Sequence, residues 1–306
     1  MTTPMTKNLA VAAAAAIVLA SAGRAGAAGD VDVAAIQQAI DAKGAHWKAG
    51  ETSLTRMSPA ERDALIPDVL EVPDLSSIFP EPEAWVPAPP PPVLPDPTAA
   101  RFSWKDYLGE DWMTEVRDQG ACGSCWAFGA LAAVEGTYNV AIGNANVDID
   151  LAEQVLVSCA DGNCDTGGMA ETVVQYLRTT GVPDEQCYPY IAANGNCADR
   201  CVDWEARSFT ISGWGWVFDL FDQEQAVKER LMSGPVITDM TVYADFMSYT
   251  EGVYEHVTGE RQGGHVVAIV GWDDEHDSWI CKNSWGRAWG DLGYFEIKRG
   301  EADLGM

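Results

Sequence analysis

The chain has 306 residues, of which 47% are hydrophobic, so it can form one large folded domain or two smaller ones. Its formal net charge of −27 makes nucleic acids and anionic membranes poor partners, because both would repel it. The charge fits a strongly hydrated surface, a saline habitat or attraction of cationic substrates.

The first 29 residues have the features of a secretory signal peptide. A weakly positive start at Lys7 precedes an apolar run over residues 9–22, and the small residues 25–27 fit a cleavage site. The run is too short to span a bilayer comfortably, and no later stretch reaches the ~18 apolar residues of a transmembrane helix. We therefore expect a secreted protein, extracellular or periplasmic, without a membrane anchor.

Residues 30–79 carry two helical signals. Val33, Ile36 and Ile40 recur at helical spacing, and residues 58–61 have the sequence of a helix start with a capping box. Two short helices bury little surface on their own, so this segment is predicted to need a partner surface.

A proline-rich tract follows over residues 80–100, with four consecutive prolines at 89–92. Proline fixes φ and removes a backbone donor, which favours an extended polyproline II linker over a folded core. The tract therefore indicates a domain boundary and an accessible place for an activating cleavage.

The remaining segment, 101–306, divides into a helix-rich half and a strand-rich half. Helices are predicted over 125–138 and 169–178. Alternating, β-branched patterns predict strands over 234–237, 266–270, 278–282 and 294–297. This order predicts an α+β domain of two lobes with a substrate cleft between them.

The run Cys-Gly-Ser-Cys-Trp at 122–126 offers a nucleophile. A helix that begins near Cys125 places the sulfur over free backbone N–H groups, which favour the thiolate. His265 follows two glycines and starts a buried-looking strand, so its ring can be held in place. Asn283 can then orient that ring. These two residues follow Cys125 by 140 and 158 positions. The other histidines lie in the N-terminal segment, a polar connection and an acidic turn: His46, His256 and His276.

This set of motifs is similar to that of the papain family of cathepsin-like cysteine peptidases, for which His and Asn lie about 130–150 residues after the cysteine. The resemblance implies a zymogen with a papain-like domain over 101–306, peptide or protein substrates, and no cofactor or metal. We expect a monomer. Residues 30–79 resemble the short inhibitory propeptides of bacterial members, so the chain's own propeptide is an expected inhibitor.

The resemblance also implies roles for single residues. Cys125 attacks the peptide carbonyl to form a thioester, His265 shuttles the proton, Asn283 orients His265, and Gln119 helps to bind the oxyanion. Gly167 and Gly168 are expected to pair with the substrate backbone. Met169 would border the pocket for the second residue before the scissile bond, which suggests an apolar preference. Trp285 is expected to shield the bond between imidazole and amide.

The eight cysteines lie between positions 122 and 281. With Cys125 as nucleophile and Cys281 as a buried free thiol, the other six can form three bridges in 15 ways. The resemblance implies a bridge between Cys122 and Cys164, and one from Cys159 to a cysteine near 197–201. The preferred set is Cys122–Cys164, Cys159–Cys201 and Cys187–Cys197.

Other functions remain open at this point. The two cysteines of Cys122-x-x-Cys125 could form a redox or metal site, but a redox site lacks the preceding strand and a zinc site needs a second pair. Scattered tryptophans could stack on carbohydrate. A transpeptidase or amide ligase on the same fold would form the same acyl-enzyme and pass it to an amine. A catalytically silent binding protein on this fold would form no acyl-enzyme.

Overall fold

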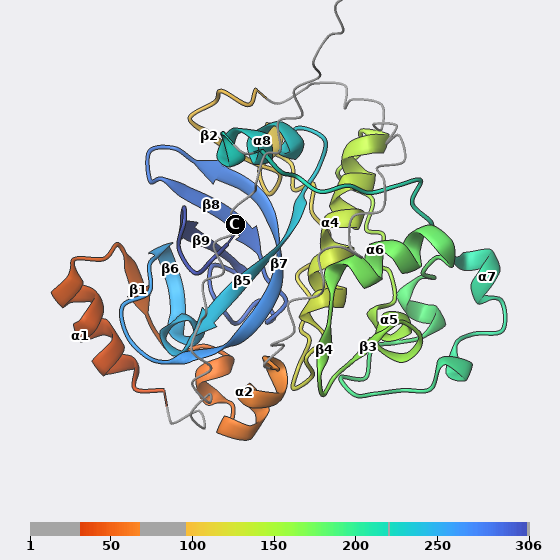
Figure 1. The fold of residues 1–306 in the computed structure, drawn as a ribbon, viewed down its shortest axis with the longest axis horizontal. Coiled ribbons are helices and arrows are strands. Elements are labelled where there is room, and N and C mark those ends of the chain that lie inside the picture. Colours follow the sequence, from red (N-terminus) through yellow and green to blue (C-terminus); the bar gives the residue numbers. More distant parts are fainter. Residues whose placement is uncertain (1–30, 68–95, 220, 305–306) are drawn as a thin grey trace, which may run out of the picture.

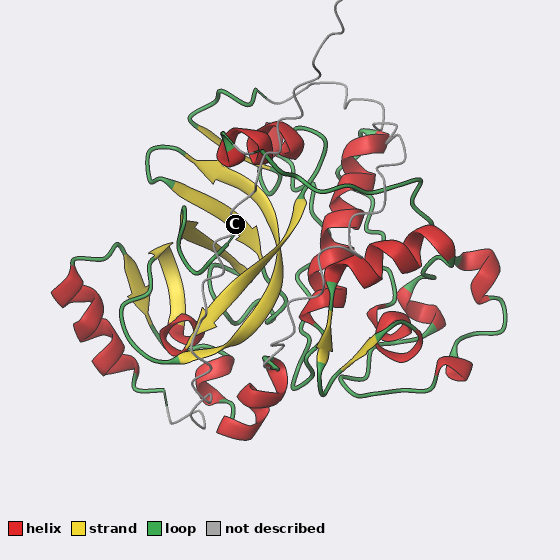
Figure 2. Cartoon of the chain, in the orientation of Figure 1, coloured by secondary structure: helices red, strands yellow, loops and turns green. Residues whose placement is uncertain are grey.

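The computed structural model describes residues 31–67, 96–219 and 221–304. A helical lobe lies beside a lobe built on a curled sheet (Figure 1). Most of the strands lie in the second lobe, which also carries helices at its periphery, and a short pair of strands lies in the helical lobe (Figure 2). The predicted signal peptide and most of the predicted linker lie outside the described residues. No helix within the described ranges is long and apolar enough to cross a membrane.

The helical lobe is built around one long buried helix. Its helices are α4 (Cys125–Ile142), α5 (Glu153–Cys159), α6 (Ala170–Thr179) and α7 (Trp204–Arg207), and a short hairpin pairs β3 (Gly162–Asn163) with β4 (Gly167–Gly168). The helix predicted over 125–138 is confirmed and runs one turn further. It ends at Gly143, which adopts the left-handed conformation with φ 66° that glycine allows.

The other lobe contains a seven-stranded sheet in the order β1-β6-β9-β8-β7-β2, with β5 paired to β7. These strands are β1 (Trp47–Ala49), β2 (Arg101–Ser103), β5 (Val236–Tyr243), β6 (Tyr249–Tyr254), β7 (Arg261–Asp273), β8 (Ser278–Lys282) and β9 (Tyr294–Lys298). Helix α8 (Gln223–Leu231) packs on β7. The strand predicted over 266–270 is therefore the centre of a longer strand that is buried along most of its length.

The N-terminal segment shares the core of the β lobe. Helix α1 (Val33–Lys43) and helix α2 (Pro59–Leu65) flank β1, which pairs with β6. Helix α2 starts with the predicted capping box. Ile36, Ile40 and Trp47 are buried in the same apolar cluster as the sheet. The partner surface that the sequence requires for this segment is thus the β lobe itself.

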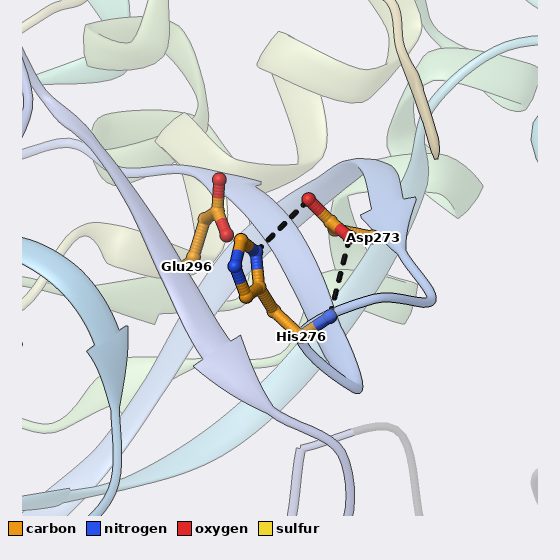
Figure 3. A group of neighbouring side chains, drawn as sticks. All are labelled: Asp273, His276 and Glu296. Carbon is orange, nitrogen blue, oxygen red and sulfur yellow. Dashed lines mark hydrogen bonds and ion pairs between the residues drawn. The ribbon is translucent and has the colours of Figure 1, made fainter. Parts of the chain in front are cut away.

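Strand β2 is fixed by an ionic cluster at the edge of the sheet. Asp273, His276 and Glu296 place their ligand atoms within 4.8 Å of one another, a spacing that could hold a metal ion (Figure 3). Arg101 Nη1 already lies 3.0 Å from Asp273 Oδ2 and 3.2 Å from Glu296 Oε1. Because this guanidinium balances both carboxylates, the cluster is explained as an ion pair that holds the start of β2.

Candidate active site

Cys125 is the first residue of α4, directly after Ser124 at the N-cap. Its sulfur therefore lies at the helix end where backbone N–H groups are unpaired and the helix dipole is positive. Cys125 is buried and belongs to no disulfide. Its neighbours are held in place, because the Ser124 hydroxyl lies 2.6 Å from the Tyr190 hydroxyl and Trp126 Nε1 donates to the Gly123 carbonyl over 3.1 Å.

The two lobes approach each other closely where α4 meets the part of β7 that carries His265. Gly129 follows Cys125 by one helical turn, and a Cβ built on it would lie 2.8 Å from the Val266 carbonyl oxygen. Glycine is therefore required there for α4 to touch β7. Val266 directly follows His265 in β7, so this contact places His265 beside the start of α4.

His265 is held in one orientation by its neighbours. Its Nε2 lies 2.7 Å from Asn283 Oδ1, and both residues are buried. The ring of Trp285 covers the imidazole at a centroid distance of 4.6 Å and is itself fully buried. His265 Nδ1 is buried with no hydrogen-bond partner among the described residues.

Gln119 is fully buried and fixed at both ends of its amide. Its Oε1 accepts from the Ser284 hydroxyl over 2.7 Å, and its Nε2 donates to the carbonyls of Cys122 and Leu65 over 2.9 and 3.1 Å. The Tyr190 hydroxyl donates to the Gln119 carbonyl. Sequence reasoning missed Ser284 and Tyr190 as supports. Ser284 stands inside the motif around Asn283 and could have been found, whereas Tyr190 lies in a segment without a motif.

The packing around them explains why Gly167 and Gly168 are glycines. Gly167 has φ 73°, which favours glycine, and a Cβ on Gly168 would lie 2.7 Å from the Trp126 ring. Met169 caps the start of α6 directly after them. The hairpin is thus held against the residue that follows Cys125.

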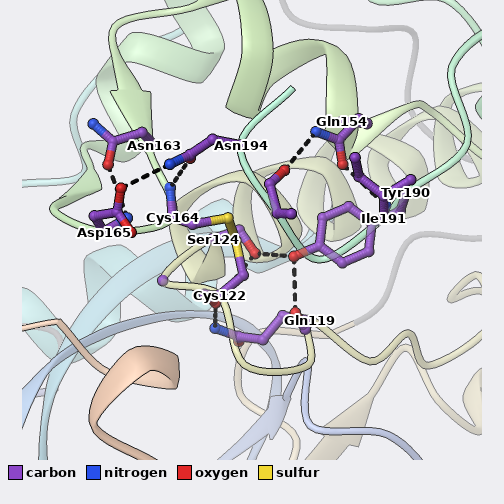
Figure 4. Close-up of a disulfide and its surroundings, with 12 residues drawn as sticks. Gln119, Cys122, Ser124, Gln154, Asn163, Cys164, Asp165, Tyr190, Ile191 and Asn194 are labelled. Carbon is purple, nitrogen blue, oxygen red and sulfur yellow. Dashed lines mark hydrogen bonds between the residues drawn. A yellow bond between two sulfur atoms is a disulfide. The ribbon is translucent and has the colours of Figure 1, made fainter. Parts of the chain in front are cut away.

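A disulfide between Cys122 and Cys164 joins the loop before α4 to this hairpin (Figure 4). The Gly123 N–H also donates to the Cys164 carbonyl over 2.9 Å. The loop that carries the nucleophile is therefore pinned to the helical lobe, as the family resemblance implied for this pair.

The preferred pairing of the other four cysteines is wrong. The structure joins Cys159 to Cys197 and Cys187 to Cys201. The chain between 188 and 201 folds back so that the Cys201 N–H donates to the Cys187 carbonyl, which brings those two residues together. Spacing along the sequence does not reveal this reversal. Cys281 is a buried free thiol, as predicted.

The end of α2 leads the N-terminal segment into the site. Besides the bond from Gln119 to the Leu65 carbonyl, the Pro67 ring fills the space that a Cβ on Gly123 would need. Ile66 fills the space that a Cβ on Gly263 would need, and Gly263 stands two residues before His265 in the sequence. Residues 65–67 therefore lie against Gln119, against the loop before the cysteine and against Gly263 before the histidine.

Comparisons with known proteins decide the family. A family model described as papain family cysteine protease matches residues 98–306, well over half of the chain. The chain belongs to the papain family of cysteine proteases. It is therefore a peptidase, a hydrolase of peptide bonds, as the sequence predicted.

Relatives of this papain-family protease include several cathepsin-like enzymes. Cathepsin B-like CP3 of Giardia intestinalis is 39% identical over 201 residues, which cover 63% of this chain and 67% of the relative. A cathepsin L-like proteinase of Fasciola hepatica is 33% identical over 207 residues, covering 65% of this chain and 61% of that protein.

Solved precursor structures share the fold. Procathepsin B S9 of Trypanosoma congolense superposes with a TM-score of 0.67 at 23% identity, covering 89% of this chain and 94% of that one. A recombinant stem bromelain precursor gives a TM-score of 0.63 at 26% identity, covering 88% of this chain and 82% of that one. The predicted α+β, two-lobed fold is confirmed.

In this papain-family protease, burial shifts the pKa values of the cysteine and the histidine in opposite directions. Burial raises the pKa of the Cys125 thiol to about 11, although the backbone N–H of Val266 acts in the opposite direction. Burial lowers the pKa of His265 to about 4, against the effect of its hydrogen bond to Asn283. Burial disfavours whichever form is charged, which explains why the two values move apart.

Proposed function

We propose that the chain is the secreted precursor of a peptidase that acts through Cys125, His265 and Asn283. The observation that carries the proposal is the buried imidazole whose Nε2 bonds to Asn283 Oδ1 while Nδ1 has no partner among the described residues. An amide oxygen only accepts, so Nε2 carries the proton and Nδ1 keeps its lone pair. Nδ1 is then the nitrogen that can take the thiol proton.

The reaction proceeds in two halves. His265 Nδ1 accepts the Cys125 proton as the sulfur attacks the peptide carbonyl, and the resulting imidazolium returns that proton to the leaving amine. The product of this half is a thioester on Cys125. Water then attacks the thioester with His265 as the base, releasing the carboxylic acid and restoring the thiol.

Gln119 supplies a donor for the oxyanion that forms in both halves. Its Nε2 is oriented by the bond from the Ser284 hydroxyl to its Oε1, so no reorganisation is needed when negative charge develops. The Cys125 backbone N–H at the start of α4 is the second donor. Gly167 and Gly168 leave room for the substrate backbone, and Trp285 keeps water from the bond between His265 and Asn283.

The N-terminal segment inhibits the site as long as it is attached. The Leu65 carbonyl uses the Gln119 donor, and Pro67 lies against Gly123. Trp47 anchors the segment, because it is buried in the β lobe and donates to the Glu255 carbonyl over 2.9 Å. An activating cleavage in the segment between Pro67 and Arg101 would allow these residues to leave. The three disulfides fit an oxidising compartment outside the cytoplasm.

The experiment is to treat the activated protein with an epoxide inhibitor and a fluorogenic peptide. We expect covalent labelling of Cys125 and hydrolysis of the peptide, both absent in Cys125→Ala. The matched control is Cys281→Ala, which removes the other free thiol and should keep labelling and hydrolysis. No labelling of Cys125 after removal of residues 1–100 contradicts the proposal. Labelling with product only in the presence of an added amine favours an amide ligase.

A further inference from the structure

Asp239 lies on β5 of the β lobe, on the side that meets the helical lobe. In β5 the side chains of Met240 and Val242 are buried inside the lobe. Because strand residues alternate, Ile237 and Asp239 face outward on the opposite side. Asp239 pairs in register with Val266, the residue after His265. Asp239 is thus one strand away from the histidine, and solvent reaches its side chain.

The outward side of β5 is the side that meets the helical lobe. Ile237 packs against the cores of both lobes, and Val266 belongs to the apolar cluster that contains Cys125. Asp239 follows Ile237 by two residues on the same side. It is close enough for its charge to raise the pKa of the Cys125 thiol, in addition to the larger effect of burial.

A second carboxylate lies nearby on the opposite lobe. Glu171 is in the first turn of α6, two residues after Met169. The protein around Asp239 desolvates its carboxylate, and this effect and then the charge of Glu171 raise the pKa of Asp239 to about 6, although solvent still reaches the side chain. Neither side chain has an ion pair or hydrogen bond within the described part of the chain. Other acids, such as Asp274, pair with basic residues instead.

We propose that Asp239 makes the cleft selective for substrates with arginine or lysine as the second residue before the scissile bond, with Glu171 as a secondary contact. This inference rests on the peptidase function proposed above. An unpaired carboxylate gains a charge-assisted hydrogen bond when a guanidinium or ammonium group enters. Met169 and Ile237 offer apolar surface for the stem of such a side chain, whose charged head then reaches the carboxylate. The apolar preference inferred from Met169 alone is thereby refined.

The test compares three peptides that differ only at that position. They carry arginine, its neutral isostere citrulline, or leucine, and kcat/KM is measured on activated protein after active-site titration. We expect arginine to exceed citrulline by about fivefold or more, the factor that one partly exposed ion pair supplies. Asp239→Asn should bring this ratio close to one, and because the ratio is taken within one protein, any change in the reactivity of Cys125 cancels.

Controls separate the local charge from the net charge of the protein. Glu205→Gln removes one exposed carboxylate in α7 and should leave the ratio of arginine to citrulline unchanged. Asp239→Glu should preserve the preference for arginine over citrulline. Asp239→Lys should cleave a fourth peptide, with glutamate at the same position, better than the arginine peptide. An unchanged ratio in Asp239→Asn, or a loss of the same size in Glu205→Gln, overturns the inference. Failure to cleave any of the peptides refutes the peptidase proposal instead, so the two failures are distinguishable.

Discussion

Trp47 offers a direct test of how the N-terminal segment closes the site. Its side chain is 3% exposed, and its ring lies 5.2 Å from Tyr254 and 6.3 Å from Tyr249. Replacing a buried tryptophan with alanine costs about 3–5 kcal/mol. This loss weakens the attachment of the segment to the β lobe, because the two tyrosines belong to β6 of that lobe. About 3 kcal/mol corresponds to roughly a hundredfold larger population with the segment detached.

The assay measures how fast Cys125 reacts with iodoacetamide in the uncleaved precursor, located by mass spectrometry. A His265→Ala background prevents self-processing. Because alkylation requires Cys125 to be uncovered, its rate follows the population of the open form when opening and closing are fast. We expect Trp47→Ala to raise this rate about a hundredfold. Trp47→Phe, which loses the bond to the Glu255 carbonyl but keeps a ring, should raise it about fivefold.

Two controls decide whether the reasoning holds. Trp216 is 51% exposed on the connection between the lobes, and Trp216→Ala should leave the rate unchanged. Cys281 is fully buried, so its alkylation would report unfolding of the whole β lobe. Equal rates for Trp47→Ala and the parent refute the anchoring role, as does a rise that is matched at Cys281.

Three further predictions concern the site, the stability and the attachment of the N-terminal segment. Gln119→Ala should lower kcat about 10²- to 10³-fold with little change in KM, measured by steady-state kinetics, because one oxyanion donor is lost; an unchanged kcat contradicts that role. Burial raises the pKa of Glu135 from 4.5 to about 7. Its folded form binds a proton more tightly than its unfolded form, so stability should fall as pH rises from about 4.5 to 7. Urea unfolding at pH 5 and pH 8 should show this difference, smaller in Glu135→Gln; an equal difference in both proteins contradicts it. The hydrogen bond from Lys43 lowers the pKa of Glu255, so their attraction is present above the usual glutamate pKa and is lost as pH falls through the lowered value. Lys43→Met should therefore speed modification of Cys125 about two- to fivefold at pH 7, and an unchanged rate at that pH would contradict the ion-pair explanation.

The sequence predicted the elements that local chemistry determines. The helix that starts at Cys125 and the contact between His265 and Asn283 follow from short motifs with a mechanism. Strand β7 begins earlier than predicted, at Arg261, because pairing with β5 overrides the low strand propensity of two glycines. The partners of Cys187 and Cys159 depend on how a loop reverses, which spacing does not encode.

Contacts between distant segments were the least predictable. Strand β1 has only three residues and becomes a strand because β6 offers an unpaired edge. The bond from Gln119 to the Leu65 carbonyl joins residues 54 positions apart and depends on the path after α2. The sequence does not indicate a role for Asp239, because its position beside Val266 depends on the register of β5 with β7.

The N-terminal segment also bears on the pKa of the nucleophile. Pro67 lies against Gly123 in the loop before Cys125, and Ile66 lies against Gly263, two residues before His265, so the segment adds to the burial of this region. Burial leaves the thiolate and the imidazolium poorly solvated, so proton transfer between the two groups is unfavourable. When the segment is removed, we expect hydration to stabilise both charges and the dipole of α4 to favour the thiolate further. We therefore expect activation to lower the pKa of Cys125 as well as to uncover the site.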